Sequence, residues 1–153
     1  MRTRQSTITI LLAEDDPDDR LLTRDALAAA RLVNRLYVVE DGVELLDYLY
    51  RRGRYASPEL APKPGLILLD LNMPRKDGRE CLIEIKSDPQ LRRIPVVVLT
   101  TSNSDEDIVR SYDLGVNSFI VKPVTFTGLV DAMQALDRYW FEIVELPPAA
   151  DQG

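Results

Sequence analysis

The segment LILLDLNMPRKDG, residues 66–78, decides the fold. Its first four residues are apolar without alternation, which predicts a short central strand covered on both faces. Asp70 follows this run at once, and the residues after it include the turn formers Asn, Pro, Asp and Gly, which predict a loop. A helical pattern begins at residue 79. The segment therefore predicts a strand, a loop and a helix in that order.

Other short apolar runs repeat this arrangement along the chain. They occupy residues 8–13 (ITILLA), 94–99 (IPVVVL) and 118–121 (SFIV), and residues 36–40 (LYVVE) predict a fifth strand. Helix-like stretches separate them at residues 17–32, 42–52, 79–87, 104–114 and from 126 onward. Regular alternation of strands and helices predicts an α/β domain with a five-stranded parallel sheet.

The composition predicts one globular domain. The chain has 153 residues, of which 45% are hydrophobic and 29% are charged, and it contains no long apolar span. We expect it to be soluble and not to enter a membrane. The formal net charge of -6 argues against a nucleic-acid surface, because phosphate binding needs clustered Lys and Arg side chains.

The residue types that are rare or missing narrow the chemistry. The only cysteine, Cys81, cannot form an internal disulfide, and no signal-peptide pattern follows Met1, so we expect a cytoplasmic location. The sequence contains no histidine, which excludes histidine-based acid–base catalysis. Any phosphohistidine in its chemistry must therefore belong to a partner.

The predicted domain covers residues 8–146. We expect residues 1–7 to form an N-terminal extension and residues 147–153 to form a loose C-terminus. Residues 53–64 contain three prolines and are long for a connection in a compact α/β unit, which indicates a surface insertion. A C-terminal helix and tail begin near residue 126.

Polar side chains follow the predicted strands at one edge of the sheet. In a parallel sheet the carboxyl ends of the strands form the functional edge, and here they bring together Glu14, Asp15, Asp70, Thr100 and Lys122. Three carboxylates at one edge repel one another unless a cation offsets their charge, and Mg²⁺ prefers oxygen ligands. The set therefore predicts a Mg²⁺ site. Asp70 is the candidate nucleophile on phosphorus, and the hydroxyl and ammonium groups are candidates to stabilise the transferred oxygens.

The motifs ILLAEDDP, LILLDLNMPRKDG, VVVLTTS and FIVKP resemble the response-regulator receiver domains of two-component signalling. The resemblance runs in order over nearly the whole chain. It implies a doubly wound, flavodoxin-like receiver fold and a phosphoryl group accepted on Asp70 from a partner histidine kinase. It also implies a signalling phosphoprotein and not an enzyme that turns over an external substrate.

The same resemblance implies a role for each site residue. Asp15 and Asp70 would bind Mg²⁺ directly, for which Mn²⁺ can substitute, with Glu14 acting through water and Asn72 offering its backbone carbonyl. The remaining implied roles are those of the switch hydroxyl, the phosphate-facing ammonium and the aromatic rotamer switch, held by Thr100, Lys122 and Phe119. Two positions depart from the family pattern, since Thr101 stands where Ala is frequent and Phe119 lacks the hydroxyl of the frequent Tyr.

A subfamily resemblance concerns partners. DGVELLDYL, the insertion, RKDGRECL and YWFEIVELP resemble single-domain regulators paired with phytochrome-type kinases, which implies a bacteriophytochrome as the partner kinase. Beyond the stripe that would face its own sheet, the last helix and tail carry a surplus of apolar residues: Tyr139, Phe141, Ile143, Val144 and Leu146. This surplus predicts a homodimer contact. The alternative is that the tail folds back on its own domain.

Two other functions use related residues. A haloacid-dehalogenase-type phosphohydrolase also has an aspartyl nucleophile, but it needs a second Asp where this chain has Asn72. A flavodoxin-like flavin or nucleotide binder would use the same sheet edge, yet no Gly-rich loop follows the first strand. A purely structural interpretation makes the acidic residues at 14–16 a helix start and Asp70 a turn former.

Overall fold

The structure, a computed structural model, describes residues 9–30, 35–100, 108, 110, 113–116, 118–121 and 125–144, with side chains in the last helix as far as residue 135. The strands are β1 Thr9–Ala13, β2 Arg35–Val39, β3 Leu66–Leu69, β4 Val96–Thr100 and β5 Ser118–Val121. The helices are α1 Pro17–Ala29, α2 Gly42–Tyr50, α3 Gly78–Ser87 and α5 Phe126–Val144, with short 3-10 helices η2 Gly53–Tyr55 and η3 Leu91–Arg93. No helix in this described part of the chain combines the length and apolar character needed to cross a membrane.

The five strands form one parallel sheet in the order β2-β1-β3-β4-β5, which confirms the predicted α/β fold. The chain passes from β1 outward to β2 on one side and then returns to β3 on the other. Strand order therefore reverses between β1 and β3, and ligands of doubly wound folds bind where the order reverses.

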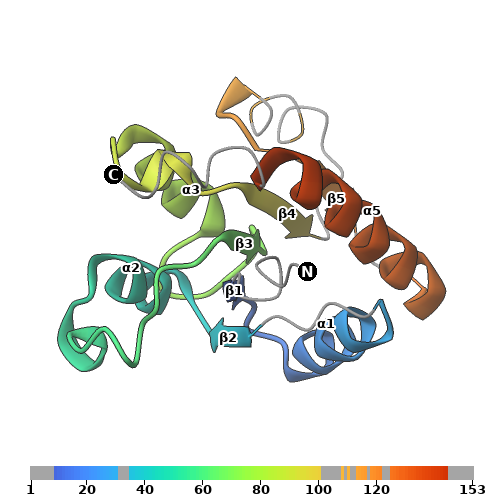
Figure 1. Cartoon of the computed structure of the whole chain (residues 1–153). Helices are drawn as coiled ribbons and strands as arrows, with labels where there is room; N and C mark the ends of the chain where they lie inside the picture. Colours follow the sequence, from blue (N-terminus) through green and yellow to red (C-terminus); the bar gives the residue numbers. More distant parts are fainter. Residues whose placement is uncertain are drawn as a thin grey trace.

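Helices cover both faces of the sheet (Figure 1). One core cluster joins the sheet to α2 and α3, and the other joins it to α1 and α5. Every residue of β1, β3 and β4 is buried, which explains why their sequences are apolar without alternation. The edge strand β2 is only partly buried, and it is also less apolar in sequence.

Several element bounds differ from the sequence prediction for local physical reasons. Helix α2 ends at Tyr50, and not at residue 52, because Arg51 adopts a left-handed conformation with φ 55°. Helix α1 ends at Ala29, with Ala30 as its C-cap. Strand β4 begins at Val96 because Ile94 caps η3, and it includes Thr100. The helix predicted over residues 104–114 lies largely outside the described residues.

The insertion after α2 packs closely on that helix. The Tyr55 ring lies 5.2 Å from the Tyr48 ring, centroid to centroid, and the Tyr48 hydroxyl donates to the Pro62 carbonyl at 2.7 Å. The Arg51 side chain donates to the carbonyl of Ala61 at 3.2 Å. Burial raises the pKa of the Tyr48 hydroxyl to about 12, with a smaller contribution from nearby Tyr37. The insertion is thus an ordered part of the α2 side of the domain.

Candidate functional site

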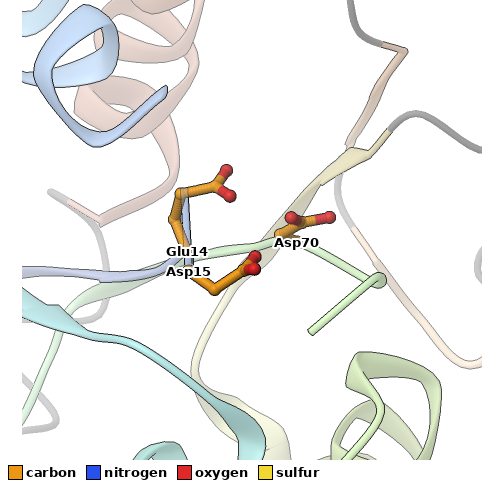
Figure 2. A group of neighbouring side chains, drawn as sticks. All are labelled: Glu14, Asp15 and Asp70. Atoms are coloured by element: carbon orange, nitrogen blue, oxygen red, sulfur yellow. The ribbon is translucent and has the colours of Figure 1, made fainter. Parts of the chain in front are cut away.

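Three carboxylates converge where β1 and β3 end. Ala13 pairs with Leu69 in the parallel register, so the residues that follow these two leave the sheet side by side. Glu14, Asp15 and Asp70 each place a carboxylate oxygen within 4.8 Å of the others (Figure 2). The side chains of Glu14 and Asp70 are buried, with Glu14 1% and Asp70 4% exposed, and Asp15 is more open to solvent.

The third acidic residue of the 14–16 run has a structural role. Asp16 is the N-cap of α1, and its Oδ1 accepts hydrogen bonds from the backbone N–H groups of Asp18 at 2.8 Å and Asp19 at 3.3 Å. Arg20, from the first turn of α1, donates to the carbonyls of both Glu14 and Asp15 at 3.0 Å. These bonds hold the short segment between β1 and α1 in one conformation.

The loop after Asp70 folds back over the end of β3. The Asn72 backbone N–H donates to Asp70 Oδ1 at 3.0 Å, and the Gly78 N–H donates to the Leu71 carbonyl at 2.9 Å. A Cβ placed on Gly78 would lie 2.4 Å from the Asp70 carbonyl oxygen, so only glycine permits this close approach. The Asp70 carboxylate is therefore oriented by the loop that follows it.

Thr100 is fully buried at the end of β4 and is linked to this loop. The Asn72 side-chain Nδ2 donates to Thr100 Oγ1 at 2.7 Å. The Asn72 Oδ1 in turn accepts from Arg79 Nη1 at 3.4 Å, and Arg79 forms an ion pair with Asp77 at 3.1 Å. The sequence predicted a role for the backbone carbonyl of Asn72 but none for its side chain or for Arg79. Their contacts depend on the path of the loop, which no residue pattern indicates.

Phe119 lies on β5, the strand next to Thr100. Val98 pairs with Phe119, and Thr100 pairs with Val121, two residues further along each strand. Side chains two residues apart on a strand lie on the same face, so Thr100 and Phe119 share a face of the sheet. Phe119 packs, partly buried, against the core cluster on the α2–α3 side. Lys122 and Thr101 lie outside the described residues.

The donor set fits Mg²⁺. Carboxylate oxygens are the ligands this ion prefers, and two of the three carboxylates here are buried, where an uncompensated negative charge is costly. A hard divalent cation offsets that cost directly. The convergence of Glu14, Asp15 and Asp70 that the sequence predicted is therefore present, and its chemistry suits a cation.

The sequence of residues 10–134 matches the family model of the response regulator receiver domain. The chain belongs to this family. Response regulator Rcp1 from Synechocystis is 44% identical over 140 residues, covering 92% of this chain and 93% of that protein. Probable methanogenesis regulatory protein FilR2 from Methanothrix harundinacea is 40% identical over 131 residues, covering 86% of this chain and 82% of that protein.

Solved structures agree with this assignment. The phosphorylated cyanobacterial phytochrome response regulator RcpA superposes with a TM-score of 0.79 at 46% identity, covering 88% of this chain and 94% of that one. The Mn²⁺-bound form of Rcp1 gives a TM-score of 0.78 at 42% identity, covering 89% and 96%. These matches confirm the flavodoxin-like receiver fold predicted from the sequence.

Family membership fixes the general function. Receiver domains accept a phosphoryl group and bind Mg²⁺, so this chain is a response regulator with a signalling role, and a sensor histidine kinase is its partner. The matched proteins give no support to the phosphohydrolase or flavin-binding alternatives.

Proposed function

We propose that Asp70 is the phospho-acceptor of this response regulator and that its donor is the phosphohistidine of a phytochrome-type sensor kinase. One observation carries the proposal: the Asp70 carboxylate lies at the end of β3 within 4.8 Å of the carboxylate oxygens of Glu14 and Asp15. An acceptor needs a nucleophilic oxygen at a place where negative charge can be compensated, and a Mg²⁺ ion held by these carboxylates would provide that compensation.

The reaction requires an in-line displacement at phosphorus. An Asp70 carboxylate oxygen forms the new P–O bond while the P–N bond to the kinase imidazole breaks, and the departing imidazole nitrogen takes up a proton. The Asn72 N–H, bonded to Asp70 Oδ1 at 3.0 Å, keeps the carboxylate in one orientation for this attack. The product is an aspartyl phosphate.

Mg²⁺ would be held by Asp15, Asp70 and the Asn72 backbone carbonyl, with Glu14 in support, and when bound it supplies positive charge beside the transferred oxygens. Lys122 is proposed to contribute an ammonium to the same oxygens. Arg20 donates hydrogen bonds to the backbone carbonyls of Glu14 and Asp15 and so holds these two residues in place beside Asp70.

The proposed signal begins at Thr100. A phosphoryl group on Asp70 would accept a hydrogen bond from the Thr100 hydroxyl, which would then leave Asn72 and move toward the acceptor. Phe119 shares this face of the sheet and would turn into the space released. The surface formed by β4 and β5 would change as a result.

The finer partner assignments are also proposals. The likeness to RcpA, a cyanobacterial phytochrome response regulator, supports a phytochrome-type kinase. A homodimer through α5 and the tail is supported by the length of α5, whose Leu129 and Met133 are buried while apolar residues continue toward Val144. The proposal also includes a cytoplasmic location, a receiver domain over residues 8–146 and no turnover of an external substrate.

Mass measurement after incubation with Mg²⁺ and acetyl phosphate tests the acceptor. The protein should gain one phosphoryl group, a chelator should prevent the gain, and Asp70→Asn should abolish it. Labelling that persists in Asp70→Asn would overturn the assignment.

Light scattering of the intact chain and of a chain ending before Tyr139 tests the proposed homodimer. A monomeric intact chain would refute the homodimer.

A further inference from the structure

The start of α2 is pressed against the loop that follows Asp70. Gly42 is the first residue of α2, and a Cβ placed on it would lie 2.1 Å from the Lys76 carbonyl oxygen and 2.7 Å from the Lys76 carbonyl carbon. These atoms are backbone, so no side-chain rotation relieves the clash. Any residue with a side chain at position 42 must displace either the helix or the loop.

A second contact joins the same two segments. Arg75 Nη1 lies 3.3 Å from Asp41 Oδ2, and the other oxygen of Asp41 accepts from the Glu44 N–H at 2.8 Å and so caps α2. Arg75 adopts a left-handed conformation with φ 68°, which a side-chain-bearing residue keeps only when its surroundings hold it there. We call the two contacts, Gly42 on Lys76 and Asp41 on Arg75, the α2 clamp.

The loop that contains Arg75 and Lys76 also contacts Asp70. Gly78 follows Lys76 by two residues and lies against the backbone of Asp70 and Leu71. Asn72, between these points, donates to the Asp70 carboxylate. The loop therefore contacts both α2 and the end of β3, and a displacement at Lys76 would alter the position of Asn72 and the orientation of Asp70.

We propose that Gly42, together with Asp41, is a positioning residue for phosphoryl acceptance. It touches neither Asp70 nor an incoming phosphoryl group, and it acts by holding the loop in the conformation that orients both Asp70 and the Asn72 carbonyl. This inference rests on the proposed function of Asp70. It assigns a part in the reaction to the β2–α2 junction, where the sequence predicted only the end of a strand at residue 40 and the start of a helix at residue 42.

Gly42→Ala and Gly53→Ala form a matched pair. Gly53 has φ +56°, and a Cβ on it would meet nothing within 4 Å. Its alanine variant therefore strains the backbone without touching the loop that follows Asp70. The rate of phosphorylation by acetyl phosphate is measured for each variant at saturating Mg²⁺. This rate is then divided by the folded fraction of the variant, which a urea titration gives. Gly42→Ala should react about 10- to 100-fold more slowly than the wild type, since misplacing a reacting group by about 1 Å costs rates of this order. Gly53→Ala should stay within about 2-fold, because it leaves that geometry intact.

Amide hydrogen exchange gives a readout that does not depend on the reaction. The N–H groups of Asn72 and Gly78 should lose protection in Gly42→Ala beyond the change in global stability, because both are bonded within the held loop. In Gly53→Ala these two amides should change only as much as the rest of the core.

The ion pair provides milder variants that are expected to fold. Asp41→Asn keeps an oxygen for the helix cap but loses the charge, and Arg75→Gln changes a side chain that is 60% exposed. Each should slow phosphorylation about 2- to 5-fold, the range of a partly exposed pair, and the double variant should be no slower than the slower single one.

The outcomes separate the two proposals. Wild-type rates in Gly42→Ala with unchanged Asn72 and Gly78 protection would overturn the α2 clamp and leave Asp70 as acceptor. If Gly42→Ala does not fold, additive or absent effects of Asp41→Asn and Arg75→Gln would overturn it instead. Failure of the wild type to be labelled, or labelling that persists in Asp70→Asn, would overturn the proposed function itself.

Discussion

Replacing Asn72 with alanine removes the hydrogen bond that the Asn72 side-chain amide donates to the Thr100 hydroxyl. The bond is 2.7 Å long, and Thr100 is fully buried whereas Asn72 lies at the surface. The substitution therefore leaves no cavity in the core, and it keeps the backbone carbonyl that we assign to Mg²⁺. It removes the amide that donates to Thr100 at 2.7 Å, together with the longer bond, 3.4 Å, that its Oδ1 accepts from Arg79.

The magnitude follows from the energy of that bond. If the Thr100 hydroxyl must leave Asn72 before it can bond to a phosphoryl group, the switch costs the net value of the bond, about 0.5–1.5 kcal/mol. A ligand that binds only the switched form has its affinity reduced by the corresponding factor, about 2- to 12-fold. Asn72→Ala removes this cost, so it should tighten the binding of such a ligand by the same factor.

Fluoroberyllate, a phosphoryl analogue that binds aspartate in the presence of Mg²⁺, is a suitable ligand. Its affinity can be measured by following the backbone amide resonances of Thr100 and Phe119 during a titration. Thr100→Val is the matched control, because it breaks the same bond from the other side but also removes the hydroxyl that the analogue needs. Its binding should weaken. Weaker binding in Asn72→Ala, or changes of the same sign in both variants, would refute the proposed release of Thr100.

Three further predictions concern the cation site, the insertion and the core. Asp15→Asn should weaken Mg²⁺ binding about 10-fold or more in a calorimetric titration, as loss of a carboxylate ligand does, whereas Asp16→Asn, which keeps the cap of α1, should not. Burial raises the folded-state pKa of Tyr48 to about 12, so its stabilising effect is complete below pH 10 and is lost as the pH rises toward 12. Tyr48 should therefore contribute a fall of about 2–3 kcal/mol in the free energy of urea unfolding over this interval, and Tyr48→Phe should remove this contribution. Met133→Ala, at a fully buried position of α5, should cost about 2–5 kcal/mol of the free energy of unfolding, and a loss below 1 kcal/mol would place α5 outside the core.

The sequence predicts the sheet well because each central strand is buried on both faces. The run at residues 66–69 matches the central strand β3 without adjustment, and the run at residues 118–121 also matches β5, which lies at the edge of the sheet. The ends of α2 and β4 were less predictable, since they depend on a left-handed residue, Arg51, and on η3, which takes up Ile94. Such boundaries are set by contacts with the rest of the fold, and the local sequence contains little information about them.

The candidate site divides in the same way. The convergence of Glu14, Asp15 and Asp70 follows from the rule that parallel strands end at one edge, so sequence order alone predicts it. The bond from Asn72 to Thr100 and the approach of Gly42 to Lys76 depend on the path of an irregular loop. That path is fixed by tertiary contacts, which explains why no residue pattern indicated either one.

We propose two functions for the loop after Asp70, and substitutions that disturb one or the other should have opposite effects. Gly42→Ala and Asn72→Ala both disturb this loop, and a general loosening would impair the site in both variants. The structure predicts opposite effects: loss of the α2 clamp misplaces Asp70 and slows its phosphorylation, whereas loss of the Asn72 amide leaves Asp70 in place and favours the switched form. Measuring the acetyl phosphate rate and the fluoroberyllate affinity in both variants therefore tests whether one loop orients the acceptor through its backbone and restrains the switch hydroxyl through a side chain.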